Sequence, residues 1–178
     1  MAWIIVLALA GLAALAALAA AVAVTARRGL VELQDARQGA WAALESQLVK
    51  RQELMERIVL LCSRALAYEG EALARATHAG AAVISAARRA DTPALAAAEM
   101  THEAAVAFLL ELAGNHPQLA DSQAFAALRE RIGILDARVA ERREQYNSVA
   151  SVLNVRRSAF PHRLVARTLG LEPAAFLS

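Results

Sequence analysis

One pair of residues in the chain has a spacing that is used in metal chemistry. Glu99 and His102 stand three residues apart in a helix-forming segment, and Glu-x-x-His pairs of this kind hold di-iron centres in helical bundles. Such a site needs two of these pairs and two further glutamates. The residues three positions before the other histidines are Arg75, Ala113 and Ala159, so the second pair is missing. We therefore expect Glu99 and His102 to lie on a solvated face, without a metal or another cofactor.

The other reactive residue types are scattered along the chain. The four histidines lack zinc-site spacing, and no His-Glu-x-x-His, Gly-x-Ser-x-Gly or phosphate-binding glycine loop occurs. The single cysteine, Cys62, excludes an intrachain disulfide and lies among apolar residues, which favours a small buried side chain over a nucleophile. We expect no catalytic residue and no enzymatic activity. A metal-dependent bundle enzyme built on Glu99 and His102 is kept as an alternative.

The charge of the chain is nearly balanced. It has 19 Lys and Arg against 17 Asp and Glu, for a net charge of +2, which does not indicate a nucleic-acid partner. The C-terminal end is more basic, because only Glu172 opposes its cationic side chains, which are Arg156, Arg157, His162, Arg163 and Arg167. A solvated bundle end explains this pattern, and contact with anionic lipid or an acidic partner is the alternative.

The first 26 residues form an uncharged apolar segment. A transmembrane helix needs about 20 such residues to cross a hydrocarbon core of about 30 Å, and Trp3 stands near one end as an interfacial anchor. A cleaved signal peptide is the alternative, because Ala21-Val22-Ala23 resembles a cleavage site. However, no Lys or Arg precedes the segment, and it exceeds the usual signal-peptide core of about 7–15 residues. We predict a retained transmembrane anchor over residues 1–26.

The residues that follow the anchor set its orientation. Arg27 and Arg28 come directly after it, whereas only the terminal amine precedes it. The positive-inside rule then places the N-terminus outside and residues 27–178 in the cytoplasm. We predict a single-pass protein of the cell membrane.

The rest of the chain has the three-four spacing of amphipathic helices. Breaks are expected at residues 68–70, 114–117 and 160–161, and Asp91-Thr92-Pro93 reads as a helix start with Thr92 as N-cap. A short helical turn over 163–169 closes at Gly170.

Each of the four expected helices has one apolar stripe. The first stripe is Leu30, Leu33, Ala40, Leu44, Leu48, Met55, Ile58, Cys62 and Ala65, and the second is Leu73, Ala76, Gly80, Val83, Ile84 and Ala87. The third is Leu95, Met100, Val106, Leu109 and Leu110, and the fourth is Phe125, Leu128, Ile132, Leu135, Val139, Arg142, Tyr146, Val149 and Leu153.

No strand is expected. Short connections between four helical segments favour neighbouring helices that run in opposite directions. The predicted fold is therefore all-α, with a transmembrane helix followed by an antiparallel four-helix bundle of long helices over residues 27–178.

Two parts of this sequence resemble the LemA family. The first part, residues 35–54, has an Ala-Trp pair followed by Gln-Leu-x-x-Arg, and the second, residues 117–170, has a Tyr-Asn pair, a later Asn and a Phe-Pro pair. The chain departs from the family at Asp35, Tyr68, Leu153 and Leu171, where Asn, His, Tyr and Phe are usual. The matching positions are Trp41, Gln47, Leu48, Arg51, Arg138, Arg143, Tyr146, Asn147, Asn154, Phe160, Pro161 and Gly170.

The resemblance implies an N-terminal span and a cytoplasmic helical domain, and it implies no specific activity. We expect Trp41, Leu48, Phe125 and Phe160 to be buried anchors, and Phe176 to pack on the bundle. Tyr146, Asn147 and Asn154 are expected to hydrogen-bond between helices and to fix their register.

The predicted function is a membrane-anchored scaffold or adaptor. It would bind protein partners, or further copies of itself, near the bilayer. The alternative from a different class is a protein that binds or remodels a lipid surface through its basic C-terminal end.

Overall fold

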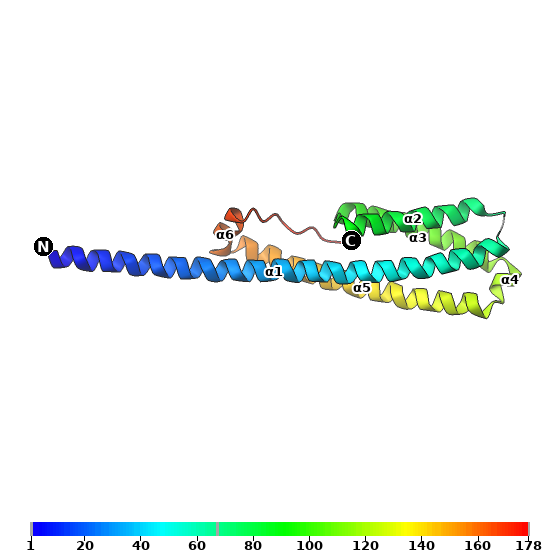
Figure 1. Cartoon of the computed structure of the whole chain (residues 1–178), viewed down its shortest axis with the longest axis horizontal. Coiled ribbons are helices and arrows are strands. Elements are labelled where there is room, and N and C mark those ends of the chain that lie inside the picture. Colours follow the sequence, from blue (N-terminus) through cyan, green and yellow to red (C-terminus); the bar gives the residue numbers. More distant parts are fainter. Residues whose placement is uncertain (1, 67, 178) are drawn as a thin grey trace. The chain divides into compact units, whose positions relative to one another are not determined.

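The computed structural model describes residues 2–66 and 68–177, and this part of the chain is helical without any strand (Figure 1). Residues 169–177 follow the last helix as irregular chain. The all-α prediction is confirmed for these residues. The helices are α1 (Ala2–Ala65), α2 (Gly70–Arg88), α3 (Thr92–Gly114), α4 (Pro117–Ala120), α5 (Gln123–Ser158) and α6 (His162–Thr168).

Helix α1 joins the uncharged N-terminal segment to the first amphipathic stripe as one helix of 64 residues. Thr25 does not interrupt it, because its hydroxyl donates to the carbonyl oxygens of Ala21 and Val22, at 3.1 and 2.9 Å. The large side chains of the apolar segment are exposed, as for Trp3 at 83% and Leu15 at 69%. By length and composition, α1 is the one helix of the described chain that could cross a membrane.

The chain divides into two compact units. Unit 1 consists of Met1–Gln38 and Ser148–Ala174, and unit 2 of Gly39–Asn147 and Ala175–Ser178. The buried apolar side chains of unit 1 come from α1, α5, α6 and the residues after α6. They are Ala26, Leu30, Ala150, Leu153, Ala166 and Ala174.

The core of unit 2 is built from the predicted stripes. Cys62 lies in it as a fully buried side chain, as predicted. Met100 was expected in the same core and is instead 73% exposed, because it falls beside the three-four spacing that Leu95 and Leu109 follow. The central cluster is Leu54, Met55, Ile58, Cys62, Leu66, Ala76, Leu109, Ala113, Leu119, Phe125 and Ile132.

The helix boundaries follow the local chemistry. The carboxylate of Asp91 accepts the N–H of Ala94 at 3.0 Å, so Asp91 is the N-cap of α3 and the prediction of Thr92 is wrong by one residue. Ser122 Oγ accepts the N–H of Phe125 at 3.3 Å at the start of α5. Among the described residues, 68–69 and 115–116 interrupt the helices within the predicted breaks at 68–70 and 114–117.

The C-terminal residues correct two predictions. Phe160 is 82% exposed and Phe176 is also exposed, although both were expected to be buried. Neighbouring residues of an extended chain point to opposite sides, so burial of Leu177 turns Phe176 towards solvent. Gly170 has a φ of +62°, a conformation that glycine adopts without strain after a helix.

Candidate functional site

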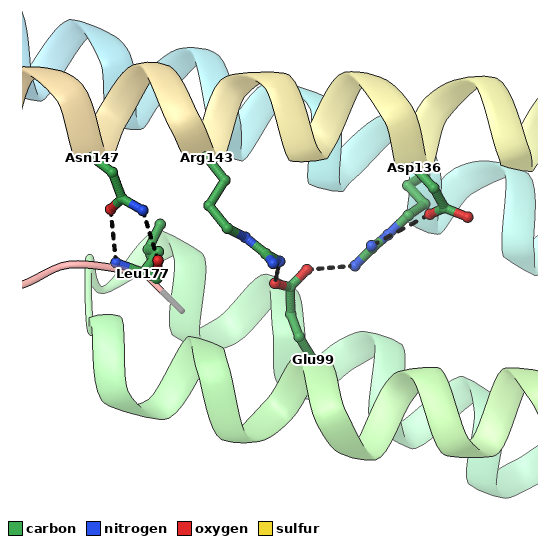
Figure 2. A network of polar contacts seen from close by, with 6 residues as sticks. Glu99, Asp136, Arg143, Asn147 and Leu177 are labelled. Atoms are coloured by element: carbon green, nitrogen blue, oxygen red, sulfur yellow. Dashed lines mark hydrogen bonds and ion pairs between the residues drawn. The ribbon is translucent and has the colours of Figure 1, made fainter.

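A network of charged side chains lies inside unit 2 (Figure 2). Arg51 of α1 donates from Nη2 to Oε1 of Glu99 on α3 at 2.9 Å, and Arg143 of α5 donates to the other oxygen, Oε2. Arg51 Nη1 also lies 3.5 Å from Oδ1 of Asp136. Both oxygens of Glu99 are therefore occupied by guanidinium groups.

The network is buried at its centre. Arg51 and Glu99 are each 6% exposed, whereas half of the Asp136 side chain is in contact with solvent. A buried charge is strongly unfavourable unless it is paired and hydrogen-bonded. Here two arginines face two carboxylates, so the formal charges of the four groups cancel.

Helical spacing explains why these polar residues are inside. On α1, Arg51 stands between Leu48 and Met55, three residues after one and four before the other. This is the next position of the buried stripe. On α3, Glu99 and His102 occupy the two successive stripe positions after Leu95. The expectation of a solvated Glu99 and His102 face is wrong, because both residues belong to the core-facing stripe.

His102 is the second unusual group of this site. It is 4% exposed, and its Nδ1 has no hydrogen-bond partner among the described residues. Burial and, to a smaller extent, the positive charge of Arg51 lower the pKa of His102 from 6.5 to about 4. His102 is therefore neutral at pH 7. It lines a cavity of about 390 Å³ whose wall also includes Met55, Ile132, Asp136 and Arg143.

The donor set does not match a di-iron centre. Such a centre needs four carboxylates and two histidines, whereas no cluster of three or more metal-binding side chains is found in the described part of the chain. The Glu99 oxygens that would bind metal already accept from Arg51 and Arg143. The geometry suits charge pairing between three helices instead.

Trp41 and Tyr146 form a second contact of unit 2. Their ring centroids are 5.2 Å apart in an edge-to-face arrangement. Trp41 Nε1 donates to the carbonyl oxygen of Ala87 at 2.9 Å, which joins α1 to the end of α2. Trp41 and Leu48 are buried, as predicted.

The asparagines of α5 bind the C-terminal residues and not another helix. In unit 2, the Asn147 amide donates to the Leu177 carbonyl at 2.7 Å and accepts the Leu177 N–H at 2.8 Å (Figure 2). Tyr146 Oη donates to the Ala175 carbonyl at 3.1 Å. The predicted helix-to-helix bonds are therefore wrong, because a side-chain amide matches the donor and acceptor of an extended peptide.

Unit 1 contains the same kind of contact. Asn154 donates to the Ala174 carbonyl at 2.9 Å and accepts the Ala174 N–H at 2.8 Å. Arg157 donates to the Leu171 carbonyl at 3.0 Å. Pro161 and Gly170 flank α6 at its two ends.

Two other predicted residues lie outside the charge network. Gln47 is half-buried on α1. Arg138 is exposed on α5 and lines a separate groove of about 410 Å³ together with Lys50, Arg57 and Arg131.

Arg51 and Arg143 are among the positions that match the LemA pattern, but the sequence did not indicate which acidic residues they bind. These are Glu99, which both arginines share, and Asp136, which pairs with Arg51. Glu99 could have been recognised from the stripe, since it stands where an apolar residue is expected. Asp136 carries no comparable signal, because exposed aspartates are common on helices.

The family profile decides the assignment of the chain. The profile described as LemA family matches residues 40–178. The chain belongs to the LemA family. The match includes the whole charge network of unit 2 and both asparagine contacts, so these features lie within the LemA region of the chain. No curated protein matches the sequence.

Proposed function

We propose that this LemA-family protein is anchored in the cell membrane by residues 1–26 and acts there as a non-catalytic scaffold or adaptor. The observation that carries the anchor is the uncharged N-terminal part of α1, whose leucines, isoleucines and valines are exposed. Burying a leucine side chain is favourable by about 2 kcal/mol, so a surface of this size strongly favours an apolar surrounding. Lipid supplies that surrounding without a protein partner.

The anchor can be tested with two leucines of the same helix. Leu15 and Leu60 are both about two-thirds exposed on α1, at 69% and 67%. Arginine at a bilayer centre costs about 2.5–3.5 kcal/mol. We expect Leu12→Arg with Leu15→Arg to move the protein from the carbonate-resistant membrane fraction to the soluble fraction. Leu60→Arg should leave it in the membrane, and equal behaviour of the two variants would contradict the anchor.

The proposed orientation has the N-terminus outside and residues 27–178 in the cytoplasm. Arg27 and Arg28 support it through the positive-inside rule. Ser46 is exposed on α1, and Cys62 is the only native cysteine. In a Cys62→Ala background, Ser46→Cys should react with an impermeant maleimide only after the cells are permeabilised. Labelling of intact cells would contradict this orientation.

We further propose that α1, α2, α3 and α5 pack in unit 2 as an antiparallel four-helix bundle. Two features support this arrangement. The residues of one apolar cluster come from all four helices, and consecutive helices are joined by connections of a few residues. Such a bundle presents long, stable helix surfaces to a partner.

A groove between α2 and α3 supports a role in protein binding. It has a volume of about 590 Å³, and half of its lining residues are alanines; the others are Glu71, Arg75, His78, Thr101 and Phe108. Small side chains let a partner helix approach closely, and Phe108 offers a large apolar contact. We expect Ala104→Arg, inside the groove, to abolish cross-linked adducts in native membranes. Ala97→Arg, exposed on α3 and outside the groove, is the matched control. Adducts that persist in Ala104→Arg, or a protein that is monomeric throughout, would contradict the scaffold.

A further inference from the structure

The corner between α5 and α6, residues 155–167, has the composition of a membrane-surface element. It contains four arginines and no acidic residue. Its large apolar side chains are exposed, including Val155 at 67%, Phe160 at 82% and Leu164 at 52%. Exposed apolar residues among cationic ones are typical of segments that lie in the interfacial region of a bilayer.

Unit 1 brings this corner next to the end of the apolar segment of α1. The Nη1 atom of Arg156 lies 3.5 Å from the position that a side chain at Gly29 would occupy. Ala26, the last residue of the uncharged segment, is buried although residues 3–25 are exposed. Elements of unit 1 therefore cover α1 where the apolar segment ends.

The depth of Gly29 matches the headgroup layer. At 1.5 Å per residue, Gly29 lies roughly 4.5 Å beyond Ala26 along the helix. The polar region of a bilayer adds about 5–8 Å on each side of the hydrocarbon core. A guanidinium group beside Gly29 therefore stands at the level of the lipid phosphates when residues 1–26 span the membrane.

The cations of the corner are available for such contacts. Arg156, Arg163 and Arg167 are exposed, while Arg157 already donates to the Leu171 carbonyl. Arg163 and Arg167 stand four residues apart, and Leu164 follows Arg163 in the same short helix. Ala166 is the buried residue of α6, so the helix packs through a small side chain and leaves its larger ones outside.

From these observations we infer that the α5–α6 corner is a second membrane contact, in which Phe160 and Leu164 enter the interface and Arg156, Arg163 and Arg167 bind anionic lipid headgroups. This inference rests on the proposed membrane anchor. The corner adds lipid selectivity, because each arginine near an anionic surface raises partitioning by about fivefold. It also fixes α5 and α6 against the bilayer.

The test uses the full chain in lipid vesicles with one fluorophore at a time. In a Cys62→Ala background, Leu164→Cys, Ser151→Cys and Leu15→Cys are each labelled with an environment-sensitive dye. Ser151 is exposed on α5 within unit 1 and serves as the matched control. The vesicles consist of phosphatidylcholine, alone or with about one-third phosphatidylglycerol, and they carry a spin-labelled lipid that quenches near the headgroups.

We expect quenching at Leu164 to be at least about twofold that at Ser151 in anionic vesicles, and smaller in neutral ones. Arg163→Gln with Arg167→Gln should remove the dependence on anionic lipid, while the Leu15 probe stays in the bilayer throughout.

A Leu164 probe no more quenched than Ser151, with Leu15 still quenched, overturns the corner contact alone. Equal quenching in neutral and anionic vesicles overturns the headgroup contacts. A Leu15 probe without quenching overturns the anchor itself. A Leu164 probe that is shielded but not quenched by lipid indicates a protein cover and also overturns the inference.

Discussion

Arg51 and Glu99 form an ion pair of 2.9 Å between α1 and α3, with the two side chains 8% and 7% exposed. Arg143 of α5 binds the second oxygen of the same carboxylate. A pair of this kind contributes little net stability when it is intact, yet its interruption leaves a buried charge without a partner. The first two predictions follow from this asymmetry.

Removal of the central acid should be strongly destabilising. Glu99→Gln keeps the side-chain size but leaves Arg51 with Asp136 alone, at 3.5 Å. We expect the free energy of unfolding to fall by about 3–5 kcal/mol. Glu103→Gln, on the exposed face of the same helix, should change it by no more than about 0.5 kcal/mol. Denaturant titration of the purified protein in detergent measures both, and equal effects would contradict a buried network.

Replacement of the two arginines together with Glu99 should have the opposite outcome. In Arg51→Met with Glu99→Leu and Arg143→Met, the remaining charge is that of Asp136, whose side chain is half in contact with solvent, so no buried charge is left unpaired. The new side chains at positions 51 and 99 continue the apolar stripes of α1 and α3. We expect a stability equal to that of the parent protein or higher by about 1–4 kcal/mol. The triple variant should therefore melt well above Glu99→Gln. A triple variant as unstable as Glu99→Gln would show that the network supplies net stabilisation.

The buried histidine predicts a dependence of stability on pH. The pKa of His102 is about 4 in the folded protein and near 6.5 when the chain is unfolded. Between these values the unfolded chain binds more protons, so stability is lost as the pH falls from about 6.5 to 4. The loss attributable to this group is about 3 kcal/mol.

Two histidine variants separate this effect from general acid unfolding. His102→Leu removes the titrating group and the unpartnered Nδ1, so its stability should fall less steeply between pH 6.5 and 4. His78 is exposed on α2, and His78→Gln should keep the parent slope. Melting temperatures across this pH range provide the measurement. A parent-like slope in His102→Leu would remove His102 as the cause.

The contact between Asn147 and Leu177 predicts local release of the C-terminal residues. Asn147→Ala removes a donor and an acceptor from Leu177, at about 0.5–1.5 kcal/mol for each hydrogen bond. We expect the Leu177 amide to exchange its hydrogen about 10-fold faster or more, with little change in the exchange of buried α5 amides. Asn147→Asp keeps the acceptor for the Leu177 N–H and should have an intermediate effect. Unchanged exchange in Asn147→Ala would contradict the contact.

Helix positions were predictable because they depend on local chemistry. The stripe of α5 from Phe125 to Leu153 is buried or half-buried at each predicted position, since three-four spacing and the absence of breakers act within a few residues. The cap of α3 was misplaced by one residue because Asp91 and Thr92 both suit the position. Only the geometry of the turn distinguishes them.

Polar core positions were harder to predict from residue type. Glu99 and His102 were assigned to a solvated face, because a charged residue is rarely buried without a partner. The partners of Glu99, which are Arg51 and Arg143, lie 48 and 44 residues away along the chain. Position 99 has the spacing of the buried stripe, four residues after Leu95, but the burial of a charge becomes favourable only when the opposite charge is present.

The sequence by itself therefore determined the helical class, the uncharged N-terminal segment, the apolar stripes and the resemblance to the LemA family. These features follow from composition and from the period of the α-helix, which act over short distances along the chain. Only the tertiary structure decided that Arg51, Glu99 and Arg143 meet, that Leu177 is buried while Phe176 is exposed, and that Asn147 binds the C-terminal residues. Each of these depends on groups distant in sequence, whose pairing energies exist only after the helices and the C-terminal residues have packed together.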